Sequence, residues 1–192
     1  MSGARFVARW EVVDVVGAVV VVDVIRAFTT AAYAFASGAS HIFLVDSVAE
    51  ALSLKAASPD MLAMGEDRGR RPDGFDFSNS PVELAAAELD GRVLVQRTSA
   101  GTRGVVAARA ATRLWCASLV CASATAAALR ASDLGDPTYV ISGRFEDDPA
   151  MSGADDLATA ELIDRARVGD ELDADRTGRL VAASDEAART LT

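Results

Sequence analysis

The sequence has little of the chemistry that disulfide scaffolds and histidine-rich metal sites require. It contains one histidine, His41, and two cysteines, Cys116 and Cys121, which both lie in apolar stretches. One histidine cannot form a histidine cluster, and two thiols in 192 residues do not make a disulfide framework. These absences exclude the small disulfide-rich class, and we expect His41 to begin a strand.

Long apolar runs and an excess of positive charge are missing as well. The run Val15–Val24 is too short to span a bilayer, and Asp23 interrupts it. Residues Met1–Trp10 show no apolar segment with a small-residue cleavage site. The 19 basic residues stand against 28 acidic ones, a formal charge of −9, which argues against nucleic acid as a partner. We therefore expect a cytoplasmic protein without a membrane or nucleic-acid partner, in which a local arginine cluster can still bind a small anion.

Four common catalytic fingerprints are also absent. No Gly-x-Gly-x-x-Gly follows a strand pattern, no Gly-x-Ser-x-Gly elbow is present, and the Gly-Lys-Ser/Thr core of a Walker loop is missing. Asp23 is followed by Val24 and Ile25, so the Asp-x-Asp pattern of the haloacid-dehalogenase phosphatases is missing too. Candidate residues must therefore be sought elsewhere, at the ends of predicted strands.

What the sequence does have is a regular alternation of short β-branched runs with Ala-rich stretches, and 51% hydrophobic residues. This pattern predicts strands at Val19–Arg26, Ile42–Val45, Met61–Met64, Val93–Val95, Leu114–Ala117 and Thr138–Ile141. It predicts helices at Phe28–Ser37, from Ser47 to Ala57, from Pro81, from Val105, from Ser123 to Ala131 and at Ala154–Arg167. We therefore predict an α/β fold: a single three-layer α/β/α domain over residues 1–192, with a mostly parallel or mixed central sheet and a weakly patterned tail at 168–192.

Polar residues gather where these strands end, at the sheet edge where α/β proteins bind ligands. Asp23 and Arg26 close the Val-rich strand, which we expect to be buried on both faces. A carboxylate for Mg²⁺ and a guanidinium for phosphate oxygens suit such an edge. The alternative is an aspartate that caps the next helix and pairs with Arg26.

Three further segments are expected at the same edge. Gly65–Gly69 and Gly74–Pro81 interleave charged residues with glycines, which fits either an anion site or an anchored loop with a helix cap. Arg97–Arg103 places hydroxyls and a glycine before a helix, which fits either an oxyanion cradle or a capped turn. The acidic residues Glu146–Asp148 and Asp155–Asp156 fit either metal ligands or favourable charges at a helix start.

Taken in order, these motifs resemble those of the 2-phosphosulfolactate phosphatase family. The matching segments are Asp23–Ala27, Gly65–Gly69, Gly74–Pro81, Thr98–Thr102 and Asp155–Asp156, and the resemblance covers about Val19 to Arg165. The chain departs from the family pattern in four places: Asp67 is an extra residue, Ser78 replaces a glycine, Ala100 replaces an asparagine, and Asp155 replaces a glutamate.

The resemblance implies an α/β/α fold, Mg²⁺ as cofactor, and hydrolysis of a phosphate monoester, in a family that acts in coenzyme M biosynthesis in the organisms that make it. We expect the partner to be a small anionic phosphorylated metabolite. The candidate metal ligands are Asp23, Glu66, Asp76, Asp155 and Asp156. The candidate catalytic residues are Asp23, Arg26, Glu66 and Arg68, and the candidate substrate-binding residues are Asn79, Ser80, Thr98, Gly101, Thr102 and Arg103.

Two alternatives stay open at this point. Ala100 and the other departures also fit a catalytically impaired anion-binding protein on the same fold. If the protein is an enzyme, Asp23 either attacks phosphorus or holds a metal-bound water.

An Ala-rich apolar surface favours a homodimer.

Overall fold

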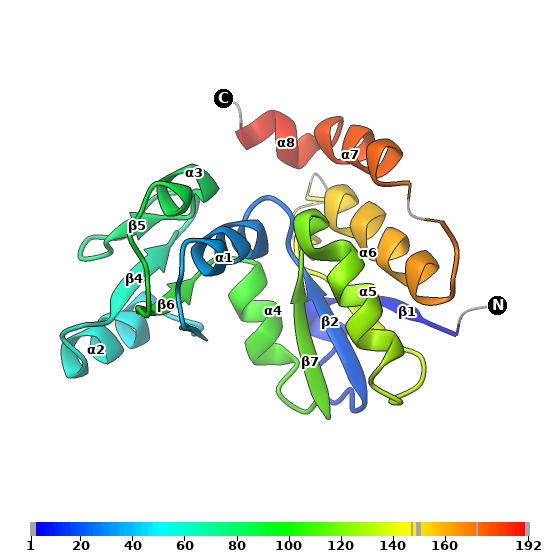
Figure 1. Ribbon diagram of the computed structural model, residues 1–192, viewed down its shortest axis with the longest axis horizontal. Coiled ribbons are helices and arrows are strands. Elements are labelled where there is room, and N and C mark those ends of the chain that lie inside the picture. The colour runs from blue at the N-terminus through cyan, green and yellow to red at the C-terminus, as the bar shows by residue number, and fades with distance from the viewer. Residues whose placement is uncertain (1–2, 147, 149–150, 172, 191–192) are drawn as a thin grey trace. The chain divides into compact units, whose positions relative to one another are not determined.

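Two compact units make up the chain. The computed structural model describes residues 3–146, 148, 151–171 and 173–190 (Figure 1). The first unit comprises Met1–Ile25 and Ala107–Thr192, and the second comprises Arg26–Val106. Each unit holds a four-stranded, all-parallel sheet flanked by helices, which confirms the α/β class and the parallel strands.

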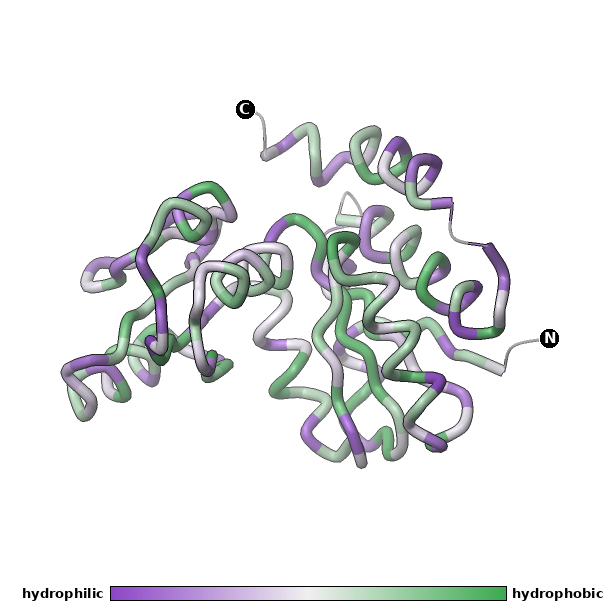
Figure 2. Tube along the Cα trace, viewed as in Figure 1, coloured by the Kyte–Doolittle hydropathy of each residue, from purple (hydrophilic) through white to green (hydrophobic). Residues whose placement is uncertain are grey.

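The sheet of the first unit has the order β1-β8-β2-β7. Its strands are β1 (Arg5–Ala8), β2 (Ala18–Val22), β7 (Arg113–Ala117) and β8 (Thr138–Ile141). The central strand β2 pairs with β7 on one side and β8 on the other, and all five of its residues are buried. It is one of the most hydrophobic stretches of the chain (Figure 2). A continuous Val run is thus a strand covered on both faces, as predicted.

Helices of the first unit cover the sheet face that Val20 and Val22 share. The helices are α5 (Ala122–Arg130), α6 (Ala154–Arg167), α7 (Ala174–Ala182) and α8 (Asp185–Thr190), with short 3-10 turns η1 (Arg9–Glu11) and η2 (Leu119–Cys121). Leu129 of α5 and Ile163 of α6 join the two valines in one buried cluster. Figure 1 shows α5 beside α6, with α7 packed on α6.

The sheet of the second unit has the order β3-β6-β4-β5. Its strands are β3 (His41–Leu44), β4 (Leu62–Gly65), β5 (Phe77–Ser78) and β6 (Val93–Arg97). Its helices are α1 (Ala27–Ala36), α2 (Val48–Ala57), α3 (Pro81–Ala85) and α4 (Gly101–Ala107). The last residue of α4, Ala107, is counted with the first unit. Ala63 and Val95 from the central strands pack with Ala51 of α2 and with Phe75. His41 begins β3, which confirms its predicted place.

The structure corrects several predicted elements. The predicted strand Val19–Arg26 is wrong at its end, because β2 stops at Val22 and the N–H of Val24 donates to a side chain, Asp156, rather than to a neighbouring strand. The short edge strands β1 and β5 were missed, and the helix predicted from Val105 begins at Gly101 instead. The tail, called weakly patterned, contains α7 and α8.

The division into two sheets also differs from the single central sheet that we expected. The βα rhythm identifies most strands but not the neighbours of each strand. Strand β2 pairs with β7 and β8, which lie about ninety or more residues away along the chain. Within the described part of the chain, no helix is both long and apolar enough to cross a membrane. A single domain, cytoplasmic location and a homodimer stay predictions.

Candidate active site

The carboxyl edge of the first sheet carries Asp23, and the main chain holds it there. The N–H of Asp23 donates to the carbonyl of Ala117 at 3.1 Å, and the N–H of Ser142 donates to the carbonyl of Val22 at 3.3 Å. The loops after β2 and β8 therefore continue side by side for one residue beyond the strands. Asp23 is 6% exposed at this edge.

Asp156, in the first turn of α6, joins these two loops. Its Oδ1 accepts the N–H of Val24 at 2.8 Å, and its Oδ2 accepts the N–H of Gly143 at 2.8 Å. Burial raises the pKa of the Asp156 carboxyl well above its ordinary value, and the charges of Asp155 and Asp23 raise it further. The structure thus brings Asp23, Asp155 and Asp156 together, as the sequence predicted; of the other acidic segment, Asp147 lies outside the described residues.

Asp155, which precedes Asp156 in the first turn of α6, is also buried. It is 2% exposed, and its Oδ1 has no hydrogen-bond partner within the described structure. Burial raises its pKa to about 7, and the charges of Glu186 and, more weakly, Asp23 add to that rise. A bound cation would relieve the repulsion between these side chains. We call Asp23, Asp155, Asp156 and Glu186 the acidic edge.

Glu186 was missed by the sequence analysis. It lies in α8, is 7% exposed, and its Oε1 accepts the N–H of Gly153 at 2.9 Å. A local signal was present: Ser184 accepts the N–H of Ala187 and so begins a helix that places an acidic pair in its first turn. That signal predicts the helix but not the distant residue that it contacts.

In the second unit, Glu66 joins the loops that follow β4 and β6. Its carboxylate accepts the N–H of Ser99 at 2.5 Å, the hydroxyl of Ser99 at 3.1 Å and the N–H of Gly69 at 2.7 Å. Arg68 lies between these contacts with φ at +50°, a left-handed conformation that is uncommon for a residue with a side chain. Such local strain is often found at functional sites.

Two arginines of the second unit keep their guanidinium groups available. Arg26 is the N-cap residue of α1 and is half-buried, whereas Arg68 is exposed. Neither guanidinium forms a hydrogen bond or ion pair within the described part of the chain. Arg103, in contrast, pairs with Asp46 at 3.1 Å, with about half of each side chain exposed.

The hydroxyl groups of Thr98 and Thr102 serve the backbone. Thr102 Oγ1 accepts the N–H of Thr98 at 2.9 Å, and Thr98 Oγ1 accepts the N–H of Thr102 at 3.1 Å. Both residues are buried, as is Gly101 at the start of α4. This geometry is that of a capped turn, the alternative that the sequence left open for this segment.

The remaining candidates of the second unit differ in their surroundings. Asp76 forms an ion pair with Lys55 at 2.7 Å, and it also accepts the N–H of Ala63. Ser80 is the N-cap of α3. Asn79 is 7% exposed, and its Oδ1 has no partner among the described side and main chains.

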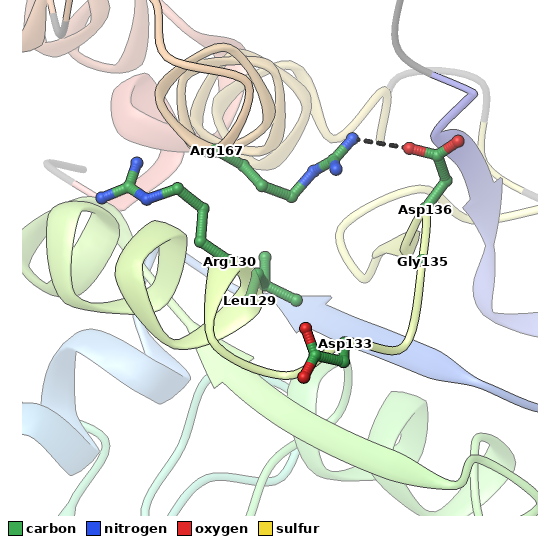
Figure 3. A pocket seen from close by; sticks show the side chains of 6 residues that line it. All are labelled: Leu129, Arg130, Asp133, Gly135, Asp136 and Arg167. Carbon is green, nitrogen blue, oxygen red and sulfur yellow. Dashed lines mark hydrogen bonds and ion pairs between the residues drawn. The ribbon is translucent and has the colours of Figure 1, made fainter.

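A cavity of about 340 Å³ lies elsewhere in the first unit, before β8 begins (Figure 3). It is lined by Leu129, Arg130, Asp133, Gly135, Asp136 and Arg167. Arg167 is already paired with Asp136 and Asp164, both at 2.9 Å. Because this cavity is at the amino end of β8 and Ser142 follows the carboxyl end, it is separate from the acidic edge.

No group of three or more His, Cys, Asp or Glu side chains in the described residues has the arrangement of a metal site. The side chains of the acidic edge therefore do not form a ready-made site of three carboxylates in this structure.

Known proteins similar to this chain agree on one family. A family model described as 2-phosphosulpholactate phosphatase matches residues 8–187. A probable 2-phosphosulfolactate phosphatase from Bacillus subtilis is 37% identical over 144 residues, 75% of this chain and 61% of that protein. One from Thermus thermophilus is 38% identical over 146 residues, 76% of this chain and 59% of that protein. The matched region thus spans about three-fifths of the length of these two relatives.

Proposed function

This chain belongs to the 2-phosphosulpholactate phosphatase family, and we propose on that basis that it is a Mg²⁺-dependent phosphatase. Its substrate would be a phosphate monoester of a small acidic metabolite. The observation that carries the proposal is Asp155, a carboxyl that is 2% exposed and has an unpartnered oxygen next to other acidic groups. Such a group needs either a proton or a cation.

The donor set of the acidic edge fits Mg²⁺ better than a softer metal, because it consists of carboxylate oxygens. We assign Asp23 and Asp155 as the ligands. When bound, Mg²⁺ would neutralise the charge that develops on the phosphoryl oxygens. Asp156 has a different task, since both of its oxygens already hold main-chain N–H groups in place.

Considered by itself, the second unit contains groups that could bind an anion. Arg26 and Arg68 carry guanidinium groups suited to bidentate contacts with phosphate or carboxylate. Glu66 helps to keep the backbone of Arg68 in position. Its carboxylate accepts the N–H of Gly69, which follows Arg68, and the N–H of Ser99 in the loop after β6. The compound named in the descriptions of the relatives contains phosphate, sulfonate and carboxylate groups. Binding all three groups would need several positively charged side chains or ions.

The test is a phosphate-release assay on the full chain with a panel of monoesters. The panel contains 2-phosphosulfolactate, 2-phosphoglycerate and phenyl phosphate, each with Mg²⁺ and with EDTA. We expect Mg²⁺-dependent release that is faster for the two acidic substrates than for phenyl phosphate. Tight binding of an acidic substrate without release would favour the catalytically impaired anion-binding protein instead, and release unchanged by EDTA would contradict the metal assignment.

A further inference from the structure

Glu186 is a buried acidic side chain with an unusual partner. It lies in the first turn of α8 and is 7% exposed. Its Oε1 accepts the N–H of Gly153 at 2.9 Å, across 33 residues of chain, and its Oε2 has no partner in the described structure. Because burying a carboxylate is costly, a contact of this kind needs a structural or functional reason.

Gly153, the residue that Glu186 contacts, is the N-cap of α6 and has φ at +64°. A Cβ at this position would lie 2.7 Å from Cγ2 of Ile141 and 2.9 Å from the N atom of Arg144. The packing therefore requires glycine here. A glycine has no side chain that could cap the helix, so α6 begins without the usual N-cap hydrogen bond.

Asp156, at the third position of α6, explains why the acceptor comes from a distant helix. In a capping box, the acidic residue at this position reaches back to the N–H of the N-cap residue. In α6, both oxygens of Asp156 instead accept from Val24 and Gly143, each at 2.8 Å. Glu186 therefore takes the N–H that Asp156 leaves.

We propose that Glu186 is a positioning residue of the acidic edge. By holding Gly153, it allows Asp156 to fix the loops after β2 and β8, and thus to fix Asp23. The catalytic consequence rests on the proposed phosphatase function, whereas the coupling between Gly153, Val24 and Gly143 does not. The tail helix α8 is in this way a part of the site.

Three variants of the full chain test the proposal. Glu186→Ala removes the acceptor, and Glu186→Gln keeps an oxygen that can accept the N–H of Gly153. Asp185→Asn is the matched control, because Asp185 is an exposed acid in the same helical turn. Residue-resolved amide hydrogen exchange is measured without Mg²⁺, and kcat and KM are measured for Mg²⁺-dependent release of phosphate from 2-phosphosulfolactate.

We expect amide exchange in Glu186→Ala to become about tenfold faster at Gly153, Val24 and Gly143. We expect kcat to fall by about tenfold while KM changes by less than about twofold, since Glu186 does not contact substrate. Glu186→Gln should bring the exchange rates back to within about twofold of the wild type. Asp185→Asn should leave both the exchange rates and kcat within about twofold of the wild type.

Several outcomes would overturn the proposal. Exchange that accelerates at Gly153 alone would show that Glu186 caps α6 without positioning the loops. If Glu186→Ala does not fold, Glu186→Gln decides: wild-type exchange supports the acceptor role, and a tenfold acceleration overturns it, because the charge would then be what matters. A wild type that releases no phosphate contradicts the proposed function only, and the exchange data still decide the positioning role.

Discussion

The two units use the same architecture with opposite electrostatics. In both, a parallel sheet ends in loops that carry the candidate residues. In the first unit the carboxyl groups are buried, and burial raises the pKa of both Asp155 and Asp156. In the second unit Glu66 and Asp76 are satisfied by N–H groups and by Lys55, and Arg68 is exposed. The first edge is therefore suited to a cation and the second to an anion.

The largest expected effect is on the cation side of this comparison. We expect Asp23→Asn to lower kcat by about 10³-fold, because the phosphoryl transfer step depends on charge neutralisation. The change is nearly isosteric, so the fold should persist. Phosphate release with Mg²⁺ measures the loss, and circular dichroism checks the fold.

Asp14→Asn is the control for Asp23→Asn, because Asp14 is an exposed acid of the same unit. It should leave kcat unchanged. Wild-type turnover in Asp23→Asn would show that Asp23 is not a catalytic residue. The buried carboxyl groups of the first unit would then not explain catalysis.

A smaller effect is expected on the anion side. Arg68→Gly removes a guanidinium group and also relieves the positive φ of +50°. We expect kcat/KM to fall by about 10²-fold through loss of a charged contact, while Tm stays nearly constant. Steady-state kinetics and a thermal melt on the same sample separate the two effects.

Arg70→Ala provides the comparison for Arg68→Gly, because Arg70 is an exposed arginine of the same loop. Equal losses in both variants would mean that the loop attracts anions only through its summed charge. An unchanged kcat/KM in Arg68→Gly would show that Arg68 does not bind substrate, and that the positive φ at this position has no functional role.

The smallest expected effect is on stability and depends on pH. Burial and Glu186 raise the pKa of Asp155 to about 7, above its ordinary value of 3.8. The folded state thus binds more protons than the unfolded state between these values, and its stability falls as pH rises through this window. In EDTA, we expect the wild type to lose several degrees of Tm between about pH 5 and about pH 8, and Asp155→Asn to lose less.

Mg²⁺ sharpens this last prediction. At about pH 8 it should raise the Tm of the wild type more than that of Asp155→Asn, because a ligand stabilises only the state that binds it. Asp185→Asn should follow the wild type in both conditions. Parallel pH profiles for the wild type and Asp155→Asn would show that Asp155 does not carry the effect.

Three of the four residues of the acidic edge could be expected at one sheet edge from the sequence, whereas Glu186 could not. Asp23 follows a fully apolar strand, and Asp155 and Asp156 begin a clear helical pattern, so the carboxyl-edge rule could place all three. For Thr98 and Thr102, the same letters fit a cradle or a capped turn, and only the hydrogen bonds distinguish them. Asp76 was grouped with the other carboxylates because its partner, Lys55, lies 21 residues earlier and carries no local signal.

By itself, the sequence determined what depends on neighbouring residues: the α/β class, most strands and helices, and the family, which the order of its motifs indicated. The tertiary structure alone decided what depends on residues far apart in the chain. It divided the strands between two sheets, since strand order follows from pairing and not from the βα rhythm. It also placed Glu186 on Gly153, because a contact across 33 residues leaves no periodicity in the sequence.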